Sequence, residues 1–329
     1  MDIDVVDPLE KQAGMYGSEM IAEKMPVAGV HASTIAEIEG GIVAAWFGGA
    51  DEGAYDVVIW MSRNEGDGWS APKPAANGID EAKRIQYPCW NPVLFKQSNG
   101  MLLLFYKVGP NPRVWWGMLQ KSKDDGLTWD KPVRLPAGYV GPVKNKPIEL
   151  ANGTLLCGSS LEDAGWRVQM ESYVQNRYWS KSKPLNSPLD YAAIQPTLLA
   201  YPDGSIQTLC RTKSGRLTEC WSHDGGKTWS VPHPIGVWGL PSHLLRLRDN
   251  RLLMTYGYRR KPFGNQARIS TDHGKTWSEP ITVSGDGANG DLGYPSTVEL
   301  QDGTLLTAWY EQMSNHPRSV LRLAKWSLL

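Results

Sequence analysis

Residues able to carry acid–base chemistry are spread singly along this chain. His31 can exchange a proton near neutral pH, and Asp51 and Glu52, in a glycine-bounded loop, can donate or accept one. Arg211 can hold an anion, and the phenol of Tyr294 can take part in proton transfer when a cation or an imidazole lies beside it. Because the length of the chain separates these residues, only a fold that gathers distant segments can combine them into one site.

The spacing of His, Asp, Glu and Cys along the chain does not indicate a metal site. No group of His, Asp and Glu has a recognisable ligand spacing, although a ring-shaped fold can collect ligands from distant segments around its axis. The four cysteines, Cys89, Cys157, Cys210 and Cys220, have no histidine at short range. We therefore expect buried thiols on strands, no metal and no cofactor.

An eight-residue pattern, Ser-x-Asp-x-Gly-x-Thr-Trp, organises the chain. Clear copies occupy residues 122–129, 222–229 and 270–277, a weaker copy occupies 62–69, and 172–179 keeps only the terminal Ser and Trp. Asp and Gly favour a tight left-handed turn, Thr or Ser bonds back to the turn backbone, and Trp supplies a packing ring. A constant period of about 50 residues between strand-forming segments is typical of β-propeller blades.

Six hairpin turns predict six blades. Each turn, such as Asn152-Gly153 or Asp302-Gly303, follows an alternating apolar segment and precedes another. We expect an all-β, six-bladed β-propeller of four-stranded antiparallel blades forming a single domain over residues 1–329. Segment 1–25 adds a strand or cap, and the last strand closes the ring with it. The predicted blades span residues 30–70, 90–130, 145–180, 193–230, 241–278 and 294–329.

Propeller geometry then predicts the location of a site. The start of each first strand and each second-to-third loop lie on one face, whereas the repeated turns lie on the other. The starts of the first strands carry His31, Trp90, Asn91, Lys144, Asn145, Lys146, Gln195, Ser242, His243 and Tyr294. The loops carry Asp51, Glu52, Lys107, Arg113, Trp115, Trp116, Glu162, Asp163, Arg211, Arg259, Arg260 and Glu311. A ring of acids, bases and aromatic side chains at one mouth is the default hypothesis for a binding site.

The repeated pattern is the Asp-box, and the chain resembles the sialidase (neuraminidase) superfamily of six-bladed propellers over nearly its whole length. That resemblance implies a clamp of three arginines for a carboxylate, a tyrosine nucleophile activated by a glutamate, and an aspartate that donates and accepts protons. Tyr294, in Gly293-Tyr-Pro-Ser, is similar to the nucleophile, and Arg211 is similar to the second arginine of the clamp. Arg259 or Arg268 stands near the third, Glu311 is similar to a late acidic residue, and Asp51 lies in the acid/base loop.

Two positions depart from the sialidase pattern. The Arg-Ile-Pro motif of the first blade is replaced by Val30-His-Ala-Ser33, so His31 stands where the first arginine is expected. Gln195 stands where the activating glutamate is expected, and an amide cannot accept the proton of a phenol. Ordinary sialic acid is therefore not the expected substrate.

The leading hypothesis is an exo-acting glycoside hydrolase for an acidic or deoxy sugar. Asp51 or Glu52 would protonate the leaving oxygen, Tyr294 would attack or stabilise the anomeric centre, His31 would assist, and Arg211 would hold an anionic group. Substrate-binding candidates are Glu52, Trp90, Asn91, Lys107, Trp115, Lys144, Lys146, Gln195, His243, Arg259 and Glu311. The first alternative is a polysaccharide lyase that cleaves uronate chains with His31 and Tyr294, and the second is a non-catalytic glycan-binding propeller.

Composition excludes some classes of partner. The formal net charge is zero and no basic run occurs, so neither nucleic acid nor an anionic membrane is an expected partner. A carbohydrate is the expected partner, and nothing in the sequence indicates an oligomeric state. The first residues have neither the basic start nor the apolar core of a signal peptide. This predicts a cytoplasmic protein, or a periplasmic or secreted one whose signal peptide has been removed.

Overall fold

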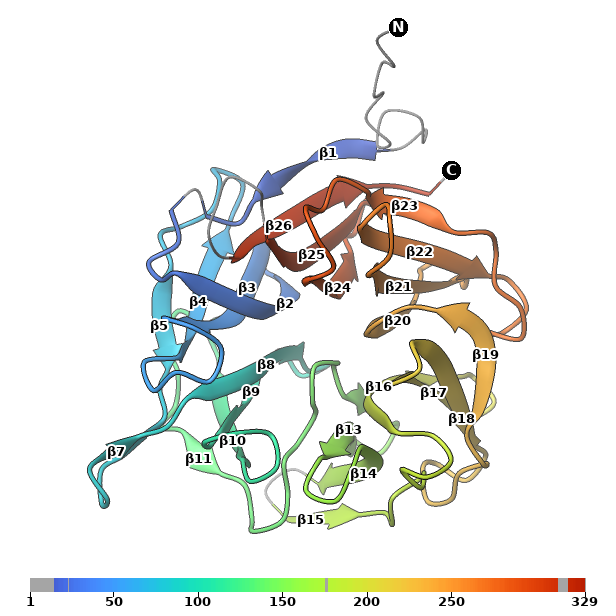
Figure 1. The fold of residues 1–329 in the computed structure, drawn as a ribbon, viewed down its shortest axis with the longest axis horizontal. Helices are drawn as coiled ribbons and strands as arrows, with labels where there is room; N and C mark the ends of the chain where they lie inside the picture. The colour runs from blue at the N-terminus through green and yellow to red at the C-terminus, as the bar shows by residue number, and fades with distance from the viewer. Residues whose placement is uncertain (1–14, 23, 175–176, 313–318, 329) are drawn as a thin grey trace, which may run out of the picture.

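Six four-stranded antiparallel sheets form a ring around a central axis in the computed structural model, which describes residues 15–22, 24–174, 177–312 and 319–328 (Figure 1). The first blade contains β2 (Gly29–Ile38), β3 (Gly41–Gly49), β4 (Val58–Asn64) and β5 (Lys73–Ala76). The second contains β8 (Cys89–Lys96), β9 (Leu102–Val108), β10 (Trp116–Ser122) and β11 (Val133–Arg134). The third contains β12 (Ile148–Glu149), β13 (Leu155–Leu161), β14 (Arg167–Val174) and β15 (Tyr178–Lys181).

The other half of the ring repeats this plan. The fourth blade contains β16 (Ala193–Ala200), β17 (Ile206–Thr212), β18 (Arg216–Ser222) and β19 (His233–Trp238). The fifth contains β20 (Ser242–Arg246), β21 (Leu252–Tyr258), β22 (Gly264–Ser270) and β23 (Ile281–Ser284). The sixth contains β24 (Leu292–Glu299), β25 (Leu305–Gln312), β26 (Ser319–Trp326) and β1 (Met15–Met20). The predicted six-bladed all-β propeller is confirmed.

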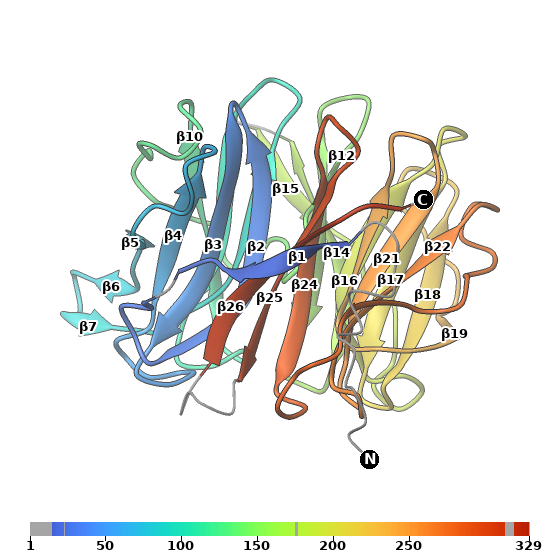
Figure 2. The same cartoon turned by 90° about the horizontal axis from the view of Figure 1, so that it is seen from above.

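The sixth blade takes its outer strand from the opposite end of the chain. Strand β1 pairs antiparallel with β26, with Glu19 opposite Leu323, and Figure 2 shows β1 crossing the outer side of that blade. Ile21, just after β1, is fully buried, and its backbone N–H donates to the carbonyl of Leu321. The N-terminal segment therefore closes the ring, as the sequence indicated. A short hairpin, β6 (Ile79–Asp80) and β7 (Ile85–Gln86), projects between the first two blades and was not predicted.

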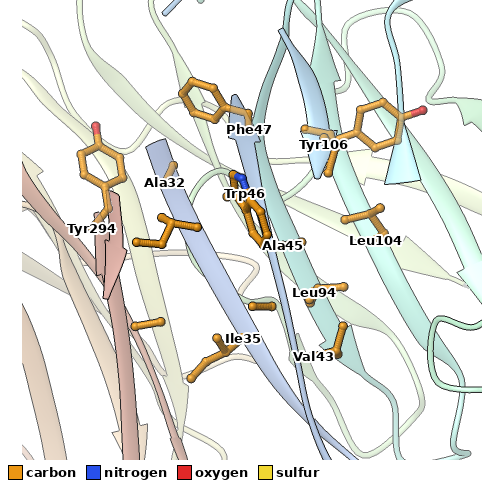
Figure 3. Close-up of a cluster of buried hydrophobic side chains, with 14 of the residues drawn as sticks. Ala32, Ile35, Val43, Ala45, Trp46, Phe47, Leu94, Leu104, Tyr106 and Tyr294 are labelled. Carbon is orange, nitrogen blue, oxygen red and sulfur yellow. The ribbon is translucent and has the colours of Figure 1, made fainter. Parts of the chain in front are cut away.

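The core lies between neighbouring blades. Ile35, Val43 and Ala45 of the first blade face Leu94 and Leu104 of the second, and all five side chains are buried (Figure 3). Separate apolar clusters fill other boundaries between blades. Because each blade buries its faces against its neighbours, the ring is stable only as a closed set.

Hydrogen bonds around the axis also join neighbouring inner strands. Thr34 Oγ1 accepts from the backbone of Leu94 at 3.2 Å, and Ser296 Oγ accepts from the backbone of Ile35 at 3.2 Å. Thr197 Oγ1 accepts from the N–H of Leu244 at 2.9 Å. Side chains of one inner strand therefore satisfy backbone donors of the neighbouring inner strand.

The repeated turns have the hydrogen bonds expected from their residues. In the turn that begins at Ser270, the hydroxyl donates to Asp272 Oδ1 at 2.8 Å and accepts from the N–H of Gly274 at 2.9 Å. Asp272 also accepts from the backbone N–H and hydroxyl of Thr276. The turns at 122–129 and 222–229 repeat this set. All three connect a third strand to a fourth, on the face opposite the predicted mouth.

All four cysteines are free and buried, as the sequence indicated. Among the residues that the structure describes, no helix is long and apolar enough to span a membrane.

Candidate active site

A β-bulge at the mouth end of the inner strand recurs around the ring. Non-glycine residues with positive φ occupy this position in four blades: Ala32 (49°), Asn91 (39°), Gln195 (55°) and Tyr294 (57°). At each one the pairing register with the second strand of the blade shifts. Bulges of this kind re-aim side chains and tolerate backbone strain where function requires it. Here they bring Gln195 and Tyr294, from separate blades, into contact.

Tyr294, Gln195 and Arg211 form one hydrogen-bonded group. The phenol oxygen of Tyr294 accepts from Arg211 Nη1 at 2.7 Å and from Gln195 Nε2 at 3.0 Å. Gln195 Oε1 accepts from the same Nη1 at 3.2 Å. Tyr294 and Gln195 are almost completely buried. Two donors directed at one phenol oxygen stabilise negative charge there, so the group is suited to a phenolate or to a reaction at that oxygen.

His31 lies within a cage of aromatic rings beside Tyr294. Its ring centroid is 3.8 Å from that of Tyr310 and 5.1 Å from that of Phe47, and the ring meets Tyr294 nearly edge-on at 4.6 Å. Burial, with the charges of Arg259 and Arg211, holds the pKa of His31 well below its usual range. Nδ1 is buried and has no partner among the described residues. The imidazole is therefore neutral at neutral pH, and the hydrogen-bonding capacity of Nδ1 is unused by the described residues.

Asp291, Tyr310 and Arg259 line the mouth beside His31. Tyr310 Oη donates to Asp291 Oδ1 at 2.8 Å and accepts from Arg259 Nη2 at 2.9 Å. Burial raises the pKa of the Tyr310 phenol, so it stays protonated. The sequence reasoning missed Asp291 and Tyr310. Asp291 immediately precedes β24, so the expectation of site residues at strand starts applies to it as well.

A cavity of about 350 Å³ opens between the first and sixth blades, lined by His31, Asp51, Glu52, Asp291 and Tyr310 among others. Loss of hydration in the mouth, then the negative charges of Asp291 and Asp51, raise the pKa of Glu52. No hydrogen bond to a carboxylate oxygen of Glu52 is found among the described residues, whereas Asp51 Oδ1 accepts from the backbone N–H of Glu52 at 2.9 Å. Of the two acids, Glu52 is therefore better suited to donate a proton.

Arg211 packs on a ring that the sequence did not single out. Its guanidinium carbon lies 5.0 Å from the ring centroid of Trp166, and the amine of Lys213 lies 5.2 Å from the same centroid. Burial raises the pKa of the nearby Glu162 carboxyl, against the opposing effect of Arg211. Glu162, one of the loop residues expected at the mouth, thus lies near Arg211 and Trp166.

Two expected mouth residues lie inside the blades instead. Strand β9 continues to Val108, so Lys107 is fully buried, and its amine donates to the carbonyl of Pro142. Glu311 is also fully buried, because it points away from the side of β25 that carries Tyr310. Its carboxylate accepts from Arg322 Nη1 at 2.7 Å and from Trp309 Nε1 at 2.7 Å. We expected Lys107 and Glu311 at the mouth, and the structure corrects this. Both side chains are packed between or within blades.

Three more expected mouth residues lie on the axis. Lys144 Nζ donates to the carbonyl of Pro295 at 2.6 Å, and Lys146 Nζ donates to the carbonyls of Leu94 and Ile35. His243 Nδ1 accepts from the N–H of Thr297 at 3.2 Å. Burial, followed by the charges of Lys144 and Lys146, holds the pKa of His243 well below its usual range. The partners of Lys144, Lys146 and His243 are inner strands, so these residues join blades instead of lining the mouth.

The expected aromatic platform is also mostly buried. Trp90 and Trp115 are each less than a tenth exposed, and their rings meet edge-on at 6.2 Å. Trp90 Nε1 donates to the carbonyl of Gly109 at 2.8 Å. Asn91 is buried beside them, and its Oδ1 has no partner among the described residues. Trp90 and Trp115 therefore support the mouth loops and do not present a ring face to a sugar.

Fold and site together define a six-bladed propeller of the sialidase-like class with a charged mouth on one face. The family model for the BNR repeat-like domain matches residues 40–307, and the chain belongs to this family. No curated protein sequence matches this chain.

Solved structures are similar to this chain over most of its length. A protein of unknown function from Dyadobacter fermentans has 21% sequence identity and a TM-score of 0.82, with 96% of this chain and 99% of that chain covered. The NanB sialidase of Streptococcus pneumoniae has 12% identity and a TM-score of 0.71, with 94% and 70% covered. The Trypanosoma rangeli sialidase, solved with the inhibitor DANA, has 15% identity and a TM-score of 0.66, with 91% and 55% covered. At these identities the similarity concerns the fold.

Proposed function

We propose that this protein is an exo-acting glycoside hydrolase for an acidic or deoxy sugar other than ordinary sialic acid. The observation that carries the proposal is the phenol oxygen of Tyr294, held by Arg211 and Gln195 at a mouth that also contains the Glu52 carboxyl. A nucleophilic oxygen and a carboxyl group with a raised pKa, near one mouth, are the two groups that a retaining glycosidase needs.

The proposed reaction has two steps. Glu52 gives its proton to the glycosidic oxygen while the bond from that oxygen to the anomeric carbon breaks, and the Tyr294 oxygen forms a bond to the same carbon. The phenol proton passes to the neutral imidazole of His31. Water, which gives a proton to the Glu52 carboxylate, then attacks the anomeric carbon while the bond from that carbon to the Tyr294 oxygen breaks. The imidazolium of His31 returns its proton to the Tyr294 oxygen. Asp51, whose Oδ1 accepts from the backbone N–H of Glu52, is the alternative proton donor.

The charges at the mouth support an anionic or deoxy sugar. Arg211 and Arg259 both lie close to Tyr294, with each guanidinium carbon 5.9 Å from its ring centroid. His31 contributes no positive charge at neutral pH, so the cationic groups next to the nucleophile are two, where the sialidase pattern expects three. A weaker clamp of this kind fits a ligand that presents less negative charge than sialic acid, or presents it elsewhere.

A panel of acidic and deoxy oligosaccharides tests the proposal. We expect release of reducing monosaccharide, with kcat reduced at least about a hundredfold in Tyr294→Phe. Tyr256→Phe is the matched control, because its phenol is also bonded to an arginine and a glutamine, Arg268 and Gln266, within the fifth blade. Full activity in Tyr294→Phe would exclude the proposed nucleophile.

A second candidate, a uronate polysaccharide lyase, is favoured by the unpartnered Nδ1 of a neutral His31 beside Tyr294. In that reaction Arg211 and Gln195 neutralise the uronate carboxylate, one of His31 and Tyr294 removes the C5 proton, and the other protonates the leaving oxygen. Growth of ultraviolet absorbance from an unsaturated uronate, in the same panel, would select the lyase and reject the hydrolase. Binding with neither signal would favour a glycan-binding propeller.

A further inference from the structure

A second groove lies on the rim of the ring, away from the mouth. It occupies about 460 Å³ between the outer parts of the second and third blades, next to β11 and β15 (Figure 1). Its lining comes from β10, from the segment around β11, from β14 and from the start of β15. The lining residues that the argument uses are Lys121, Lys131, Arg134, Arg177, Tyr178 and Trp179.

The groove occurs where the repeated turn has been lost. The segment 172–179 keeps Ser172 and Trp179 of the eight-residue pattern but lacks its Asp, Gly and Thr. Arg177 and Tyr178 occupy the end of this segment, and both are exposed. Arg177 and Tyr178 thus present a cation and an aromatic ring at the rim.

The floor of the groove is apolar and aromatic. Trp179 stacks on Tyr173 with ring centroids 4.7 Å apart and an interplanar angle of 21°. Val133 and Tyr178 are 61% and 60% exposed, which is unusual for side chains of this size and polarity. An exposed ring beside an apolar floor offers the flat surface on which the C–H face of a pyranose stacks.

The charges around this floor are unbalanced. Lys121, Lys131, Arg134 and Arg177 line the groove, against the single acid Asp130, in a chain whose formal net charge is zero. Among the described residues, no ion pair joins Lys131, Arg134 or Arg177 to a carboxylate. A concentration of unpaired cations of this kind attracts an anionic ligand.

We propose that this rim groove binds a stretch of an acidic polysaccharide, with pyranose rings on Tyr178 and the apolar floor and carboxylates or sulfates on the surrounding cations. The site is separate from the mouth and would hold a polymer on the enzyme while one chain end is processed. Binding there does not depend on the reaction at Tyr294, so it can be tested whether or not the protein is a hydrolase.

Titration calorimetry with the full chain tests this proposal. The probes are a hexasaccharide of galacturonate, its neutral counterpart maltohexaose, and a single-stranded oligonucleotide of six residues. All are measured on an Arg211→Met background, which disables the anion clamp at the mouth. We expect the uronate hexasaccharide to bind, with an affinity that falls as salt rises, and maltohexaose to bind at least about tenfold more weakly.

Variants locate the binding. Lys131→Glu combined with Arg177→Glu, and separately Tyr178→Ala, should each weaken uronate binding by about tenfold or more. Lys227→Glu combined with Lys275→Glu is the matched control, because both lysines are exposed on intact repeated turns. All variants should keep the thermal unfolding midpoint of the background. Unchanged uronate binding in the rim variants, equal binding of maltohexaose, tighter binding of the oligonucleotide, or no uronate binding at all would each overturn the proposal.

Discussion

Glu52 is the residue on which the proposed acid chemistry depends most directly. We expect Glu52→Gln to reduce kcat by about 10²- to 10⁴-fold, because an amide cannot protonate the leaving oxygen. Asp51→Asn should have a smaller effect, since one carboxylate oxygen of Asp51 already accepts from the backbone N–H of Glu52. Initial rates of the two variants with the best substrate of the panel measure the difference, and the opposite order would transfer the acid role to Asp51.

The pH dependence of kcat tests independently whether Glu52 is the proton donor. The reaction requires the protonated form, so activity should fall as pH rises through the elevated pKa of Glu52. Asp291 contributes to that elevation, and Asp291→Asn should therefore move the alkaline limb of kcat to lower pH. If the alkaline limb does not move in Asp291→Asn, a group other than Glu52 controls it.

Sequence reasoning found some site residues and misplaced others for a definite reason. His31, Gln195 and Tyr294 were found because they occupy strand starts, where propeller geometry determines which face they reach. Lys107 and Glu311 were misplaced because a strand one or two residues longer than expected changes whether a side chain lies in a loop or between blades. Asp291 could have been found, because it immediately precedes β24 and so lies at a strand start. Tyr310 was missed because its importance comes from contacts with His31 and Arg259 in other blades, which no local pattern records.

At the scale of the strand, the bulges are the devices that shape the mouth. Ala32 has a φ of 49° in β2, a conformation that a β-branched residue adopts only at a high energetic cost. Ala32→Val should lower the free energy of unfolding by about 1–3 kcal/mol, whereas Ala32→Gly should change it by less than about 1 kcal/mol. Ala36→Val, in the regular part of the same strand, controls for added volume. Urea unfolding measures all three, and equal losses in the two valine variants would mean that backbone strain is not the cause.

The strands and turns were more predictable than the site, because their conformation follows from the chemistry of neighbouring residues in the sequence. The repeated turn encodes its own hydrogen bonds through Ser, Asp, Gly and Thr, and each Asn-Gly or Asp-Gly hairpin marks a pair of strands. The bulges were not predictable, because Ala32, Asn91, Gln195 and Tyr294 share no residue type that favours positive φ. Their common conformation accompanies a shift in pairing register between the first and second strands of each blade.

At the scale of the whole ring, buried amines join blades at the axis. The amine of Lys146 donates to two carbonyls, and a neutral amine has two hydrogens, enough for both bonds. Burial lowers the pKa of Lys146 to about 7. In the unfolded chain that pKa is about 10.4, so between these values the unfolded state binds more protons. Stability should therefore rise with pH from about 7 to about 10.

The contribution of Lys146 to the pH dependence of stability can be separated from that of other buried amines. In Lys146→Met the slope of unfolding free energy against pH should decrease by up to about 1.4 kcal/mol per pH unit within that window. Lys227→Met, on an exposed turn, should leave the slope unchanged. Chemical unfolding at several pH values provides the measurement, and an unaltered slope in Lys146→Met would imply that its amine is charged in the folded protein.

The pairing of β1 with β26 also imposes an order on biosynthesis. Met15–Met20 leaves the ribosome before any other strand of the ring, yet its partner Ser319–Trp326 is the last strand to be made. Five blades can assemble from contiguous segments as they emerge, but β1 must wait, unpaired along the edge that β26 will cover, until β26 has been made. During that interval the unpaired edge is the part of the nascent chain most open to capture by a chaperone or by another copy.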